Sequence, residues 1–222
     1  MKAGHSFALG ALALAVSMAA QAGQPAAPTR AAMTAALNKY LAQHGDLCIG
    51  RYDWPIDVPV AEFAYPSRDT LQLPTMENAG LVSSSTAMVQ RSEGDGDEKQ
   101  MKVVEVRRYE LTDEGRRFYL KRTMVSGGPG GAPVPHDGDF CAGRLSLDKV
   151  LSWDKPAVVG DHEETVVTYT YRIAAYPWAK DEDLQDVFPM VAKVVNGGGS
   201  MKLQQRMRRV GNNWVAVQVW EK

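Results

Sequence analysis

The sequence is poor in the features that mark most functional classes. Only two cysteines occur in 222 residues, and 25 basic against 26 acidic residues leave a formal net charge of −1. A chain this close to neutrality has no overall field that attracts nucleic acid or anionic lipid. We therefore expect no nucleic-acid partner.

The short motifs of the common enzyme classes are missing as well. There is no Gly-x-Ser-x-Gly turn, no His-Glu-x-x-His pair and no phosphate-binding P-loop. The segment 162–164 (His-Glu-Glu) lacks the second histidine of a metal motif, and the acidic run 181–183 opens a predicted helix, where negative charge is favoured. We interpret both segments as structural, and we expect no cofactor.

Long apolar runs are absent except near the N-terminus. Lys2 is followed by an almost unbroken apolar run from Phe7 to Met18, which is too short to span a bilayer as a stable helix. Residues 20–22 (Ala-Gln-Ala) then give the small-x-small pattern at which signal peptidases cut. Residues 1–22 are therefore predicted to be a signal peptide, and the alternative is a retained membrane anchor. We expect a periplasmic or secreted protein without stable membrane insertion after cleavage.

Hydrophobic periodicity predicts regular structure after a loose leader at residues 23–28. Apolar residues on one face predict a helix from about Arg30 to His44, and strict alternation predicts a strand over 163–173. Proline at a first helical position has no hydrogen bond to lose, so Pro74 is predicted to begin a short helix. Further predicted elements are a strand at 102–111, a helix at 181–195 with a break at Pro189, and a hairpin of 201–210 with 214–220.

One segment resembles part of a known DNA-binding fold. Residues 76–82 (Met-Glu-Asn-Ala-Gly-Leu-Val) precede a predicted hairpin, and residues 107–117 (Arg-Arg-Tyr-Glu-Leu-Thr-Asp-Glu-Gly-Arg-Arg) follow it. This order is similar to the recognition helix, wing and closing helix of the phenolic-acid and multiple-antibiotic-resistance families of bacterial repressors. The resemblance implies a winged-helix scaffold over residues 74–120.

DNA binding, which the same resemblance implies, is not expected here. The recognition-helix segment 74–79 has no arginine or lysine and contains Glu77, whereas DNA contacts need donors there. We interpret the nearby basic residues as a solvated face. These residues are Arg107, Arg108, Arg116, Arg117, Lys121 and Arg122.

A glycine- and proline-rich segment at residues 126–139 is the predicted boundary between two halves. The first half, residues 29–125, is predicted to be helical and winged-helix-like. The second half, residues 140–222, is predicted to be a mostly antiparallel sheet that carries one helix. The expected fold class is therefore α+β, with the two halves packed together.

The most specific internal feature is a repeat that contains both cysteines. Residues 46–51 (Asp-Leu-Cys-Ile-Gly-Arg) recur as residues 139–144 (Asp-Phe-Cys-Ala-Gly-Arg), and we expect the two segments to be neighbours in one sheet. In an oxidising compartment the default is a disulfide between Cys48 and Cys141. Such a bond would tie the two halves of the chain together.

A metal site is the alternative use of the same cysteines. His44 lies just before Cys48 and His136 just before Cys141, so the four side chains have the ligand types of tetrahedral zinc. The spacings His-x3-Cys and His-x4-Cys permit such a site without being diagnostic. Exported thiols tend to oxidise, which favours the disulfide over the metal.

Three functions are consistent with these observations. The first is a non-catalytic exported protein that binds or scaffolds in the cell envelope, with an envelope protein or a small ligand as its partner. The second is an exported hydrolase whose site combines His136 or His162 with nearby acids. The third is a periplasmic zinc-binding protein that uses the four residues named above.

Overall fold

The computed structural model describes residues 27–93, 100–126 and 134–217. The predicted signal peptide and most of the predicted leader lie outside the described residues. Among the helices of these ranges, none has the length and apolar character needed to cross a bilayer.

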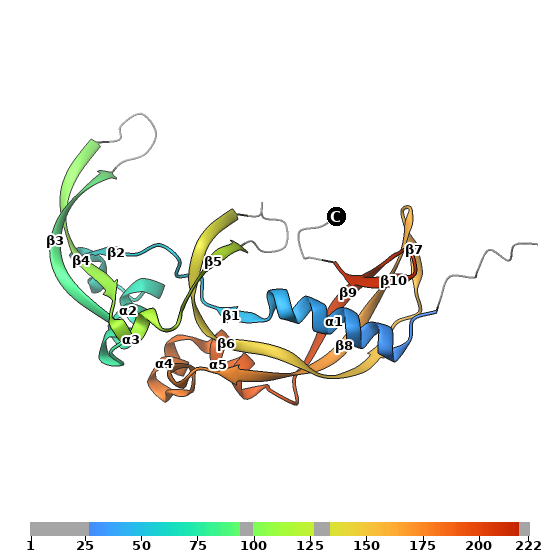
Figure 1. Ribbon diagram of the computed structural model, residues 1–222. Coiled ribbons are helices and arrows are strands. Elements are labelled where there is room, and N and C mark those ends of the chain that lie inside the picture. The colour runs from blue at the N-terminus through green and yellow to red at the C-terminus, as the bar shows by residue number, and fades with distance from the viewer. Residues whose placement is uncertain (1–26, 94–99, 127–133, 218–222) are drawn as a thin grey trace, which may run out of the picture.

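A curled antiparallel sheet forms the larger part of the protein (Figure 1). Its central order is β1-β6-β8-β9-β10, while β5 pairs with β6 and β7 pairs with β8. Its strands are β1 (Asp46–Cys48), β5 (Tyr119–Ser126), β6 (Val134–Trp153), β7 (Ala157–Val159), β8 (His162–Ala175), β9 (Lys202–Val210) and β10 (Asn213–Ala216).

A three-stranded sheet of order β2-β4-β3 lies at one end of the molecule. Its strands are β2 (Ile56–Pro59), β3 (Val82–Glu93) and β4 (Gln100–Leu111). The helices are α1 (Arg30–His44), η1 (Val60–Ala64), α2 (Arg68–Asn78), α3 (Asp113–Arg116), η3 (Pro177–Lys180), α4 (Glu182–Val187) and α5 (Pro189–Asn196).

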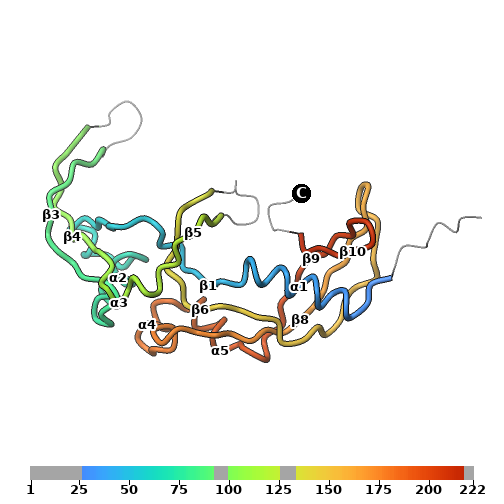
Figure 2. Tube along the Cα trace, viewed as in Figure 1, coloured from blue at the N-terminus to red at the C-terminus, as the bar shows by residue number. Residues whose placement is uncertain are grey.

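Helix α1 lies on the concave side of the larger sheet, as the blue segment of Figure 2 shows. The Thr29 hydroxyl caps it by accepting a hydrogen bond from the Ala32 amide, and it ends at His44 as the periodicity predicts. Met33, Leu37 and Leu41 are buried against strand residues of the larger sheet. Burial of apolar surface stabilises a fold by about 25 cal/mol per Å², and here it holds α1 against the concave face of the larger sheet. The partners are Val150, Val167, Tyr169, Met207 and Trp214.

A second core joins the two sheets. Phe140 of β6 contacts Trp178 of η3, and Trp178 contacts Phe188, with ring centroids 5.3 and 5.7 Å apart. Tyr109 of β4 and Leu73 of α2 belong to the same buried cluster. Three hairpins, β3–β4, β5–β6 and β7–β8, project on the same side of this framework in the view of Figure 1.

The predicted fold class is wrong. Strands make up about half of the described residues, and the N-terminal half is not a helical, winged-helix-like unit, because β1 to β5 all lie in it. The second half carries α4, α5 and η3 rather than one helix. Local periodicity identified α1 but could not show that β1 pairs with β6, since the paired residues are more than 90 positions apart in the chain, as for Cys48 and Cys141.

The structure tests several of the local predictions. The helix at 30–44, the strand at 163–173 and the break at Pro189 are confirmed. The hairpin of β9 with β10 is confirmed as far as Ala216, and residues 218–220 of the predicted second strand lie outside the described ranges. Pro74 does not begin a helix, because it lies inside α2, which starts after the capping residue Ser67. The glycine- and proline-rich segment is partly regular: β5 ends at Ser126 and β6 starts at Val134, and residues 127–133 lie outside the described ranges.

Candidate functional site

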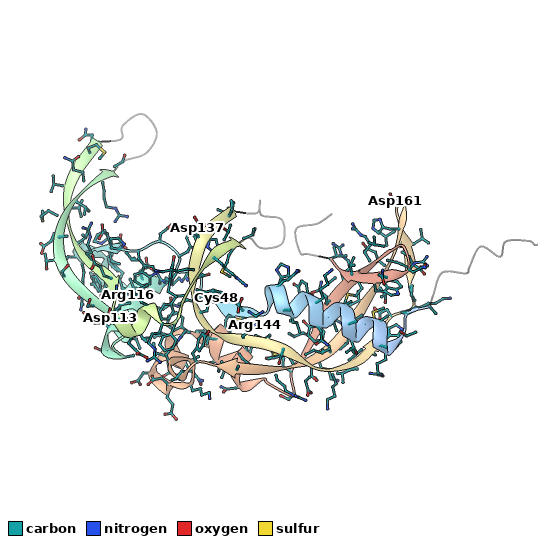
Figure 3. The ribbon with its side chains drawn as sticks, viewed as in Figure 1. Cys48, Asp113, Arg116, Asp137, Arg144 and Asp161 are labelled. Carbon is teal, nitrogen blue, oxygen red and sulfur yellow. A yellow bond between two sulfur atoms is a disulfide. The ribbon has the colours of Figure 1, made fainter. Side chains whose placement is uncertain are left out.

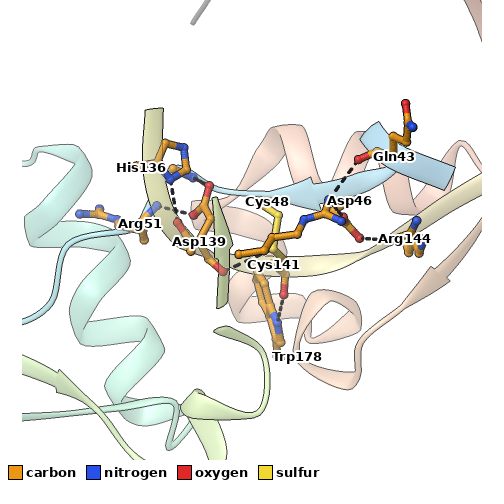
Figure 4. Close-up of a disulfide and its surroundings, with 12 residues drawn as sticks. Gln43, Asp46, Cys48, Arg51, His136, Asp139, Cys141, Arg144 and Trp178 are labelled. Carbon is orange, nitrogen blue, oxygen red and sulfur yellow. Dashed lines mark hydrogen bonds and ion pairs between the residues drawn. A yellow bond between two sulfur atoms is a disulfide. The ribbon is translucent and has the colours of Figure 1, made fainter. Parts of the chain in front are cut away.

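The repeated segments lie side by side, as the repeat predicts. Strand β1 pairs antiparallel with β6, with Cys48 opposite Cys141 and Asp46 opposite Arg144. Cys48 and Cys141 form a disulfide (Figure 4). The predicted covalent tie between the two halves of the chain is therefore present, and the thiolates of a zinc site are not.

The antiparallel arrangement also gives the aspartate of each copy a partner at the end of the other copy. It brings the first residue of each copy against the last residues of the other, on either side of the disulfide. The Arg144 guanidinium donates to Asp46 at 2.8 Å. At the other end, the backbone amides of Gly50 and Arg51 donate to the Asp139 carboxylate at 3.2 and 2.8 Å. The repeat is thus one reciprocal structural unit.

The Asp139 end of this unit is buried. Burial raises the pKa of Asp139, and the amide donors of Arg51 and Gly50 oppose that shift. The Arg51 side chain is buried too, and it reaches Asp69 at 2.6 Å and the Gln72 side-chain oxygen at 3.0 Å, both on α2. This end therefore fixes the disulfide strand to the helix beneath the smaller sheet.

The Asp46 end carries an excess of positive charge. The Asp46 carboxylate is shared by two guanidiniums, from Arg122 of β5 and Arg144 of β6. Arg122 also donates to the Gln43 carbonyl at 3.1 Å, and Arg144 donates to the Ala42 carbonyl. Both carbonyls lie in the last turn of α1, where cations are favoured by the helix dipole. Two cations and one anion leave one positive charge at this point.

A groove of about 580 Å³ opens beside this charge, between the end of α1 and strand β5. A smaller hollow of about 180 Å³ continues it toward β10, and both share Tyr40, Gln43 and His44. The larger groove is also lined by Ala42, Asp46, Arg122, Thr123, Met124 and Val125, and the smaller by Ala36, Lys39, Trp214, Val215 and Ala216.

Two side chains that line the groove, His44 and Tyr40, have pKa values shifted toward their uncharged forms. Burial, followed by the nearby Arg122 charge, lowers the pKa of His44. Burial raises the pKa of Tyr40, whose ring lies 4.9 Å from the His44 ring. His44 and Tyr40 can therefore offer neutral hydrogen-bonding groups beside a fixed guanidinium.

This arrangement suits binding better than catalysis. The acid that lines the larger groove, Asp46, is held by two arginines and so is not available as a general base. Met124, Val125 and the Tyr40 ring add apolar surface to the lining of the groove. A ligand with an anionic group and an apolar body would match both parts.

The histidines of the hydrolase hypothesis lie elsewhere and apart from each other. His136 stacks on Tyr52, with centroids 4.2 Å apart, and its Nδ1 lies 2.7 Å from the Gly138 carbonyl oxygen. His162 lies between Asp161, 2.7 Å from Nδ1, and Glu164, 2.9 Å from Nε2. Figure 3 shows that Asp137 and Asp161, which adjoin these histidines, occupy different hairpins.

The structure does not assemble the alternative zinc ligands. His44 faces the groove, His136 is on the β5–β6 hairpin, and Cys48 and Cys141 are bonded to each other. Within residues 27–93, 100–126 and 134–217, no group of three or more His, Cys, Asp or Glu side chains could hold a metal ion.

Sequence reasoning missed most of the groove. Arg122 stood in the basic cluster that was interpreted as a solvated face, and its partner Asp46 is far away in the chain. The arginines before it pair with separate carboxylates rather than forming one surface. These pairs are Arg107–Glu77, Arg108–Asp57, Arg116–Asp113 and Arg117–Glu114. The Asp in the repeat was the one available signal for this site.

Comparison of the chain with known protein families, curated proteins and solved structures finds no match. No relative therefore assigns a role to the groove. A proposal for function therefore depends on the charge, volume and lining residues of the groove.

Proposed function

We propose that the protein is an exported, non-catalytic binding protein of the cell envelope that holds an anionic, partly apolar ligand in the groove between α1 and β5. The observation that carries this proposal is the Asp46 carboxylate shared by Arg122 and Arg144 at the groove. One guanidinium satisfies the carboxylate, so the second brings a charge that a ligand can neutralise.

Arg122 is the side chain best placed to meet such a ligand. It lines the groove and is 37% exposed, whereas the Asp46 side chain beneath it is 9% exposed. A guanidinium offers several N–H donors in one plane, so it can keep its bond to Asp46 and still donate to a carboxylate, sulfonate or phosphate. The fixed position of Arg122 lowers the entropic cost of binding.

The rest of the groove sets the size and polarity of the ligand. A volume of about 580 Å³ lies within the range of roughly 300–1,000 Å³ that small-molecule sites occupy. Met124, Val125 and Tyr40 offer apolar contact, while Gln43 and neutral His44 offer hydrogen bonds. We infer a small amphipathic anion rather than a sugar or a bare inorganic ion.

Export is part of the proposal and is supported by two features. The N-terminal residues have the order of a signal peptide, and the groove adjoins a disulfide, a bond that persists in oxidising compartments. Cell fractionation with N-terminal sequencing tests it: the expected product begins at Gly23 and lies outside the cytoplasm. A cytoplasmic protein with residues 1–22 intact would overturn this part.

Ligand binding can be tested with a matched pair of fluorescent probes. 8-Anilinonaphthalene-1-sulfonate carries one sulfonate, and N-phenyl-1-naphthylamine has the same rings without it. Arg122→Gln should weaken binding of the sulfonate probe about tenfold, equivalent to about 1.4 kcal/mol, and leave the neutral probe within about twofold. Arg122→Lys, which keeps the charge, should give an intermediate value.

The control variant is Arg172→Gln, which removes an arginine that is also paired with an aspartate, Asp148, at 3.1 Å. Arg172 lies on β8 and does not line the groove, so both probes should bind this variant as they bind the wild type. Equal loss of both probes in Arg122→Gln, or unchanged sulfonate binding with the fold intact by circular dichroism, would contradict the proposed site.

A further inference from the structure

Strand β3 is an edge strand of unusual length and regularity. It pairs with β4 on one side only, and the register runs without a shift from Val82 opposite Leu111 to Glu93 opposite Gln100. In Figures 1 and 2 its free edge faces away from the larger sheet. Such an edge presents a row of backbone donors and acceptors to any strand that approaches it.

The hydrogen bonding identifies which backbone groups face outward. The Ser84 amide donates to the Glu77 carboxylate at 2.9 Å, so it points away from β4. Because donors alternate along an antiparallel strand, the even-numbered residues direct their backbone groups to the free edge. Within the described ranges, no bond is made to the outward backbone groups of Thr86, Met88, Gln90 and Ser92.

Strand β3 also lacks the usual protection of an edge. Natural edge strands carry proline, lysine or a bulge, which discourage pairing with another chain. None of these is present between Val82 and Glu93. Glu77 blocks the edge at Ser84 alone, which leaves four outward residues open.

We propose that this edge pairs antiparallel with the same edge of a second copy of the chain, about a two-fold axis at Val89. The open residues are symmetric about this position: Thr86 would exchange hydrogen bonds with Ser92 of the second copy, and Met88 with Gln90. All four open residues find partners in this register, and the two three-stranded sheets become one six-stranded sheet.

The charges of β3 favour a second copy over an unrelated acidic or basic strand. Arg91 is the single charged residue between Val82 and Ser92, and in this register it faces Ala87 of the second copy. The two Arg91 residues would be four residues out of alignment, about 13 Å apart at roughly 3.3 Å per residue. That exceeds the screening length of about 8 Å at physiological ionic strength.

Exposed apolar side chains on the same hairpin agree with this pairing. Met88, Met101 and Val103 are 62%, 64% and 62% exposed. They belong to one face of the hairpin, because Gln90 is opposite Val103 and Ser92 is opposite Met101. Pairing at Val89 brings Met88 of each copy beside Gln90 of the other, so the two apolar patches become neighbours across the new contact.

Proline substitution provides the test, because the Met88 amide is not used by β4. Met88→Pro removes an outward donor and should leave the β3–β4 ladder and the thermal midpoint nearly unchanged. By sedimentation velocity at about 100 μM, the disulfide-bonded wild type should be dimeric and Met88→Pro monomeric. Met88→Thr keeps the amide and should remain dimeric.

Cysteine cross-linking tests the register. Val89→Cys places two thiols directly opposite each other and should give a covalent dimer on mild oxidation. Ala87→Cys should not, since its two copies would be about 13 Å apart. A monomeric wild type, a dimer that survives Met88→Pro, or equal cross-linking of the two cysteine variants would overturn the proposal.

Discussion

Asp57 and Arg108 show how single side chains hold the smaller sheet together. Arg108 of β4 donates from Nε and from a terminal nitrogen to the two carboxylate oxygens of Asp57 on β2, each at 2.7 Å. This two-point contact fixes both distance and orientation, which a single ion pair does not. The sequence analysis grouped Arg108 with other basic residues, whereas in the fold it pairs specifically with the Asp57 carboxylate.

The pH dependence of stability should reveal this pair. The hydrogen bond from Arg108 holds the pKa of Asp57 below its ordinary value of 3.8. Ionised Asp57 therefore stabilises the fold above that value, and this contribution is lost as the pH falls through the lower pKa of the folded state. Asp57→Asn should lower the thermal midpoint at pH 7, and the gap to the wild type should narrow progressively as the pH falls below 3.8.

Asp113→Asn is the control for this measurement. Asp113 is fully exposed and pairs with Arg116 three residues later on the same short helix, at 2.8 Å. An exposed pair of this kind contributes little, so its midpoint should follow the wild type at every pH. A constant gap for Asp57→Asn between pH 3 and pH 7 would show that the carboxylate charge is not what stabilises the pair.

At the scale of elements, strand β1 has an effect out of proportion to its three residues. It carries Asp46 and Cys48, and it follows α1 after the single residue Gly45. The added Cβ of any other residue at Gly45 would lie 2.4 Å from the Leu41 carbonyl oxygen and 2.5 Å from that of Leu145. Glycine is therefore required where helix and strand meet β6.

Loss of the disulfide should weaken the whole fold. The bond between β1 and β6 closes a loop across 93 residues, which restricts the unfolded chain. Replacing Cys48 and Cys141 together by alanine should lower the free energy of unfolding by about 2–4 kcal/mol in urea denaturation. Wild-type protein treated with a reductant should behave like the variant, and the variant should not respond to the reductant. Equal midpoints for oxidised wild type and variant would contradict this expectation.

Elements whose pattern is local were predictable from the sequence. Helix α1 has its apolar residues on one face and a capping threonine, and β8 alternates clearly. The repeat also predicted that β1 and β6 are neighbours, because matching segments with one cysteine each are natural partners. Helix α2 was misplaced because the capping pair Ser67 and Thr70 was overlooked in favour of Pro74.

At the scale of the whole molecule, the arrangement was not predictable. The curl of the larger sheet depends on pairing between strands far apart in sequence, such as Asp46 with Arg144 on one side and Glu164 with Arg208 on the other. The groove needs the end of α1 and strand β5 together, and no local pattern links Gln43 to Arg122. A division into two halves hid this, since β6 contacts strands from both.

The short distance along the chain between Asp46 and Cys48 has a consequence for where the protein can work. The carboxylate that positions Arg122 and the sulfur that locks β1 to β6 are two residues apart on one strand. Reduction of the disulfide would free β1 from its covalent link to β6, and Asp46 on β1 would then hold Arg122 less firmly. Under the proposed export and binding functions, the groove would therefore be fully formed only in an oxidising compartment, where the disulfide persists.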